Sequence, residues 1–227
     1  MIFTRYAIYF APPAGAGWTR FATSWLGWDM ETGSPVAHPF AEGIDVAAVT
    51  RVPRKYGLHA TLKPPFHLHN GRTVEALHDA CASLAARHAP VALHGLEIAP
   101  LGRFLALRPI GEQDALNALA ARCVQDLDEF RTPATEQELA RRRSTGLTAE
   151  QDTNLVHWGY PYVLNAFRFH ITLSGRLDKT TLQQVRAALD AQLGPLLPQP
   201  FRINDLALVG EAEDGRFHLI QRYVLTG

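Results

Sequence analysis

The chain contains one short pattern of residues twice, in His59-Ala60-Thr61-Leu62 and in His170-Ile171-Thr172-Leu173. Each copy lies in an apolar run, residues 56–62 and 167–173, that predicts a buried strand. Because strand side chains alternate, each histidine shares a face with the threonine two residues later. Two facing histidines can open a phosphodiester without a metal, since one takes a proton from water while the other protonates the leaving oxygen.

Further residues on the same strand faces are candidates for binding the phosphate. The hydroxyls of Thr61 and Thr172 would donate to its non-bridging oxygens and stabilise developing charge. Lys63 and Arg168 fall on the faces of their histidines and predict phosphate cations, although surface ion pairs explain them as well. Tyrosines are candidates for lining a ligand cleft, with aromatic packing as the alternative; these are Tyr56, Tyr160 and Tyr162.

A single His-x-Thr in a strand is common, so the evidence for a site is that the pattern recurs within a larger repeat. A strand, a helix and a hairpin follow one another twice. The first set covers residues 56–62, 73–88, 91–99 and 103–109, and the second covers 167–173, 179–193, 201–209 and 216–225. Phe104 follows His59 by 45 residues, and Phe217 follows His170 by 47. This spacing indicates an internal duplication.

The duplication predicts an α+β fold in which two strand–helix–hairpin units pack around a pseudo-twofold axis and a central cleft. Residues 1–227 form a single bilobal domain, with lobe one at about 45–110 and lobe two at about 162–227. A strand at 4–10 joins the sheets, and Pro64-Pro65 should end the first histidine strand. Helices are also expected at 18–26 and 113–130.

The polar segment 131–160 interrupts the repeat and contains Arg141-Arg142-Arg143. One interpretation is a solvated helical insertion that begins at a cap on Thr148. The other is a lid that places arginines over an anionic ligand, since a long insertion beside a cleft is often functional.

Composition limits the partners and cofactors of the chain. Lysine plus arginine (22) equals aspartate plus glutamate (22), so no overall field attracts nucleic acid, which is a disfavoured partner beside a small phosphorylated substrate. Cys81 and Cys123 lack metal-type spacing and predict buried thiols. No run is long and apolar enough to span a membrane, and no phosphate-binding glycine loop is present. We therefore expect a cytoplasmic protein without metal or cofactor.

Three segments resemble a known family. RYAIYFAPP at 5–13, YGLHATLKPPF at 56–66 and WGYPYVLNAFRFHITLSGRL at 158–177 are similar to a bacterial branch of the 2H phosphoesterase superfamily that is linked with phosphonate catabolism. The resemblance implies a bilobal fold with a central cleft and metal-independent chemistry at a phosphodiester. His59, Thr61, His170 and Thr172 match the superfamily motif residue by residue.

Together these features predict a cyclic phosphodiesterase with His59 and His170 as the catalytic residues. The link with phosphonates suggests the cyclic phosphate of a phosphorylated ribose as substrate. Two alternatives stay open. The first is an enzyme that processes RNA 2′,3′-cyclic phosphate ends, and the second is a non-catalytic module that binds RNA or a phosphorylated metabolite.

Overall fold

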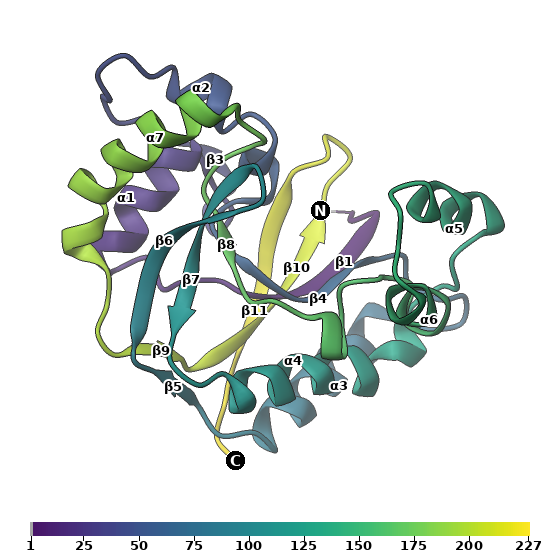
Figure 1. The fold of residues 1–227 in the computed structure, drawn as a ribbon. Helices are drawn as coiled ribbons and strands as arrows, with labels where there is room; N and C mark the ends of the chain where they lie inside the picture. Colours follow the sequence, from purple (N-terminus) through teal and green to yellow (C-terminus); the bar gives the residue numbers. More distant parts are fainter. Residues whose placement is uncertain (1) are drawn as a thin grey trace.

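The computed structural model describes residues 2–227 and has an α+β fold built on two antiparallel sheets (Figure 1). The larger sheet has the strand order β11-β10-β1-β4, and the smaller has the order β6-β7-β8. The strands of the larger sheet are β1 (Arg5–Phe10), β4 (Ala60–Phe66), β10 (Asp205–Glu211) and β11 (Phe217–Val224). Those of the smaller sheet are β6 (Gly95–Leu101), β7 (Phe104–Ile110) and β8 (Ile171–Thr172).

Two further strand pairs and the helices complete the fold. The pairs are β5 (Val91–Leu93) with β9 (Phe201–Ile203), and β2 (Trp28–Asp29) with β3 (Ser34–Pro35). The α-helices are α1 (Gly17–Leu26), α2 (Val46–Val49), α3 (Val74–Ala86), α4 (Asp114–Asp126), α5 (Glu136–Arg143), α6 (Ala149–Trp158) and α7 (Lys179–Gln192). Short 3-10 turns are η1 (Pro53–Tyr56), η2 (Asp128–Phe130), η3 (Leu164–Ala166) and η4 (Gly194–Leu196). None of the helices within residues 2–227 has the length and apolar character needed to cross a membrane.

The helices pack on the sheets through apolar faces. α3 and α4 contact the larger sheet, and α7 contacts the smaller one (Figure 1). Thr73 begins α3 by accepting a hydrogen bond from the Ala76 amide, and Asp178 caps α7 in the same way. The apolar stripe of α3, with Leu77, Cys81 and Leu84, is buried in the main core. The repeated helices therefore form where the sequence predicts them.

The two repeats exchange strands. β4, which belongs to the first repeat, lies in the sheet that holds the β10–β11 hairpin of the second. β8, from the second repeat, pairs with β7 of the first. Each sheet therefore combines strands from the expected lobes at 45–110 and 162–227, and β1 lies inside the larger sheet, between β10 and β4. This exchange leaves β4 and β8 as edge strands in contact with each other.

The first histidine strand differs from its expected form in two ways. Tyr9 pairs with Thr61 but Ile8 pairs with Lys63, so a bulge inserts one extra residue in β4 and turns Lys63 to the buried side. The Lys63 ammonium donates to the Val124 carbonyl at 2.9 Å and lies 3.4 Å from Asp128 Oδ1. The expectation that Lys63 binds phosphate is wrong. β4 also continues through Pro64-Pro65, which an edge strand tolerates.

Three other elements depart from their expected limits. In the run 167–173, only Ile171–Thr172 is paired as a strand. The helix expected at 113–130 ends at Asp126 and continues as η2. The segment 131–160 folds into α5 and α6, and Thr148 with Gln151 forms a capping box at the start of α6.

Replacing Lys63 by Ala tests its structural assignment. The change leaves the Val124 carbonyl and part of the Asp128 carboxylate without their buried donor. We expect the free energy of unfolding to fall by about 2–4 kcal/mol. Urea denaturation of Lys63→Ala and of the control Lys55→Ala, whose side chain is only half-buried, measures the difference. Equal stability of Lys63→Ala and the wild type would contradict the assignment.

Candidate active site

A cleft of about 560 Å³ lies where the two histidine strands meet. His59 and Thr61 line it from the β4 side and Thr172 from β8. β1 contributes Arg5 and Tyr9, which share a strand face. Among the described residues that line the cleft, none is an aspartate or a glutamate. The cleft is therefore built from both repeats and is positively charged.

Both histidines are held by the same local hydrogen bond. His59 Nδ1 lies 3.0 Å from the Gly57 carbonyl oxygen, and His170 Nδ1 lies 2.7 Å from the Arg168 carbonyl oxygen. A carbonyl oxygen only accepts, so each Nδ1 carries the hydrogen and each neutral ring keeps the Nε2 lone pair. The acceptor is the residue two positions earlier in both repeats. The duplication thus extends from the histidines to the groups that orient them.

The ring of His59 packs tightly at the cleft. It stacks on the buried ring of Tyr9, with centroids 4.0 Å apart, and lies 5.7 Å from the ring of Tyr56. Burial lowers the pKa of His59 to about 4, the Gly57 carbonyl opposes this shift, and a charge on His170 lowers the pKa further. His59 is therefore a neutral base at pH 7.

His170 lies behind the cleft lining. It is half-buried, and its ring packs 5.8 Å from the ring of Phe104, which lines the cleft. His170 itself does not line the cleft. Burial also lowers the pKa of His170, the Arg168 carbonyl opposes the shift, and the charge of Arg108 adds to it.

Thr61 and Thr172 are half-buried on the cleft wall. Within residues 2–227 neither hydroxyl makes a hydrogen bond, although Ser174 beside them accepts one from the Leu105 amide at 2.9 Å. The two hydroxyls are therefore free to donate to a ligand in the cleft.

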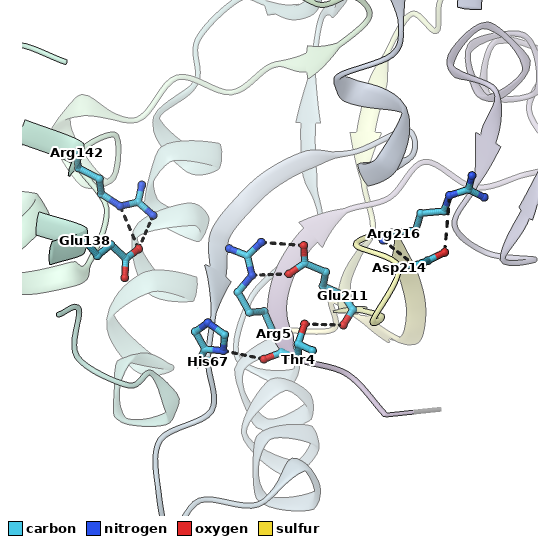
Figure 2. Close-up of polar contacts among 8 residues, drawn as sticks. All are labelled: Thr4, Arg5, His67, Glu138, Arg142, Glu211, Asp214 and Arg216. Carbon is cyan, nitrogen blue, oxygen red and sulfur yellow. Dashed lines mark hydrogen bonds and ion pairs between the residues drawn. The ribbon is translucent and has the colours of Figure 1, made fainter. Parts of the chain in front are cut away.

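Five cationic side chains line the cleft, and we call them the cleft cations: Arg5, Lys55, Arg141, Arg142 and Arg176. Figure 2 shows Arg5 paired with Glu211, and Arg142 bonded to Glu138 through two of its nitrogens. The Arg5 pair fixes the guanidinium on β1 while its remaining N–H donors stay available.

Sequence reasoning named Arg141 and Arg142 of this set through the inserted segment, but the two cations that it selected on the histidine strands are not members of the set. It selected Lys63, which is buried, and Arg168, whose exposed guanidinium donates to the carbonyls of Asn165 and Phe167 and does not line the cleft. It missed Arg5. Arg5 stands four residues before Tyr9 on the same strand face, and this spacing was the signal that could have identified it.

The tyrosines divide in a similar way. Tyr56 and Tyr160 line the cleft, whereas Tyr162 is 46% exposed and does not. The T-shaped packing of Tyr162 on Tyr160 accounts for its place.

Residues 61–218 match the DUF1045 family, described as a protein of unknown function. The chain belongs to this family. Two curated relatives are each 36% identical and are named ribose 1,5-bisphosphate phosphokinase PhnN; they come from Janthinobacterium sp. (strain Marseille) and Laribacter hongkongensis (strain HLHK9). The alignments cover 93% and 97% of this chain but 48% and 51% of the relatives. The chain therefore spans about half the length of these relatives.

Solved structures of low sequence identity are similar along the whole chain. Escherichia coli LigT complexed with 3′-AMP has 15% identity and a TM-score of 0.47, with 100% of both chains covered. The TT0787 protein of Thermus thermophilus has 16% identity and a TM-score of 0.44, with 98% of both chains covered.

Nitrogen NMR of the two imidazoles tests their orientation. At pH 7 both His59 and His170 should be Nδ1–H tautomers, because each Nδ1 donates to a carbonyl. The variants His59→Asn and His170→Asn assign the two signals. An Nε2–H tautomer at either position would show that the hydrogen bond described above does not orient that ring.

The lowered pKa of His59 also predicts a pH dependence of stability. Between about pH 6.5 and pH 4, His59 binds a proton in the unfolded chain but stays neutral in the folded protein. The free energy of unfolding should therefore fall as the pH drops through this window. Denaturant unfolding of His59→Asn should show a shallower fall than the wild type, and parallel curves would contradict the shifted pKa.

Proposed function

We propose that this chain is a cyclic phosphodiesterase in which His59 and His170 act as base and acid. The observation that carries the proposal is the duplicated arrangement of the two His-x-Thr pairs. They lie on edge strands that contact each other, and each imidazole is fixed by a carbonyl two residues earlier. A lone structural histidine has no reason to repeat its threonine, its orienting carbonyl and its place in a duplicated unit.

The proposed reaction opens one ring bond of a cyclic phosphate by in-line attack of water. His59, neutral at pH 7, takes a proton from water as its oxygen bonds to phosphorus. The bond from phosphorus to one ring oxygen breaks, and His170 gives that oxygen a proton. The product is a phosphomonoester with a new hydroxyl. Burial lowers the pKa of His170 in the free protein. The negative charge of the bound phosphate raises that pKa, and His170 then takes up the proton that it later donates.

The rest of the cleft supports phosphoryl chemistry. Thr61 and Thr172 carry free hydroxyls at the wall, positioned to donate to the non-bridging oxygens. Among the cleft cations, Lys55 and Arg176 supply positive charge to the reacting phosphate, and neither has an ion-pair partner among residues 2–227. The residues present therefore provide a base, an acid and charge stabilisation, which are the parts that this reaction needs.

The relatives' names suggest the substrate. If a 1,2-cyclic phosphate of 5-phosphoribose loses its bond from phosphorus to O2, the product is ribose 1,5-bisphosphate. That compound stands in the names of the two curated relatives. No lysine of this chain follows a glycine, so a phosphate-binding loop of the GK[ST] type is absent from it. We therefore assign the ring opening, and not the named kinase step, to this chain.

Phosphorus NMR with a panel of cyclic phosphates tests the proposal. The panel holds 5-phosphoribose 1,2-cyclic phosphate and the four nucleoside 2′,3′-cyclic phosphates. We expect turnover of the ribose compound, unchanged by EDTA. His59→Ala and His170→Ala should each lower kcat at least ~10²-fold, as expected for loss of a general base or acid. Thr61→Val and Thr172→Val should lower kcat by about 10- to 100-fold while keeping the side-chain shape.

Tyr162→Phe is the matched control, because Tyr162 lies outside the cleft, and it should keep full activity. Faster turnover of the nucleotides would move the assignment to RNA ends. Tight binding without turnover of any member would make the chain a binding module and end the enzyme proposal.

A further inference from the structure

The segment between the two repeats brings a second group of side chains to the cleft. Arg141 and Arg142 lie in the last turn of α5, and Tyr160 follows α6; all three line the cleft. Arg142 Nη2 donates to Glu138 Oε1 at 3.0 Å, as Figure 2 shows, and its guanidinium lies 5.0 Å from the Tyr160 ring centroid. The Arg142 side chain is 22% exposed. It is therefore held at the cleft wall.

The three consecutive arginines of α5 do not share one role. Arg143 turns to α6, where its Nε donates to Asp152 Oδ1 at 2.6 Å. Arg141 has no carboxylate partner within residues 2–227 and lines the cleft instead. Favourable interaction with the helix C-terminus is available to all three. That interaction does not explain why two of them face the cleft.

The balance of charge in the cleft exceeds what one cyclic phosphate needs. Glu211 offsets Arg5, and Glu138 offsets Arg142. Lys55, Arg141 and Arg176 have no ion-pair partner among residues 2–227, which leaves three uncompensated positive charges on the cleft lining. A cyclic phosphodiester brings one negative charge, whereas a phosphomonoester brings about 1.5 to 2. Together the two groups neutralise the unpaired cations.

We propose that Arg141 and Arg142 bind a second phosphate of the substrate, a phosphomonoester remote from the reacting phosphorus. This inference deepens the proposed function and takes the identity of the reacting group from it. Guanidinium groups bind phosphate oxygens through paired N–H donors, and Tyr160 and Glu138 hold Arg142 ready for that contact. The inserted segment therefore selects doubly phosphorylated sugars, while the two repeats carry out the reaction.

A substrate pair separates the second phosphate from the reacting one. 5-Phosphoribose 1,2-cyclic phosphate and ribose 1,2-cyclic phosphate differ only in the 5-phosphate. The double variant Arg141→Ala/Arg142→Ala should lose about 10²-fold in kcat/KM on the first compound, mostly through KM, because two charged hydrogen-bond donors are lost. On the second compound the loss should be under about 3-fold. Lysine at both positions should restore part of the loss.

Arg143→Ala is the matched control on the same helix and should leave both substrates unaffected. An equal loss on both compounds, or wild-type turnover that ignores the 5-phosphate, would overturn the second phosphate site while leaving the phosphodiesterase intact.

Calorimetry with ribose 5-phosphate gives a readout that does not need turnover. The double variant should bind this probe at least ~10-fold more weakly than the wild type and Arg143→Ala. If the wild type opens no cyclic phosphate, the proposed function fails and this comparison still decides the binding site. Unchanged binding in the double variant would refute it.

Discussion

The site depends on one constraint, the exchange of strands between the two repeats. β4 pairs with β1 beside the β10–β11 hairpin, and β8 pairs with β7, so each sheet contains strands from both halves. Because of this exchange the two histidine strands lie at sheet edges that contact each other. Pairing within each repeat would leave two separate sheets, with one His-x-Thr pair in each. The exchange therefore brings both His-x-Thr pairs to one cleft, which His59 lines directly and which His170 borders through the ring of Phe104.

The edge position of the two strands has chemical consequences. An edge strand leaves its free side open to a ligand, and it tolerates the bulge that separates Thr61 from Lys63. The bulge keeps His59 and Thr61 at the cleft while Lys63 is buried against α4 and η2. The cleft takes its positive charge from β1, η1, α5 and the loop after β8 instead. Side chains from four separate segments therefore contribute to one electrostatic environment.

The sequence was informative where a local pattern determines structure. The alternation of strand side chains placed Thr61 and Thr172 on the same faces as their histidines. The caps at Thr73 and Thr148 lie at the starts of α3 and α6. It failed where pairing between distant segments decides the outcome. The bulge that turns Lys63 inward arises from the register with β1, and the exchange of strands arises from contacts between the repeats. Neither leaves a periodic signal in the chain.

The pH dependence of kcat/KM tests most directly whether the two motifs form one site. The wild type should give a bell-shaped profile on the cyclic ribose phosphate, reporting one base and one acid. His59→Ala should lose the acidic limb and His170→Ala the basic limb, because each variant removes one partner of the pair. Loss of the same limb in both variants, or a full bell in either, would contradict the account of a shared two-histidine site.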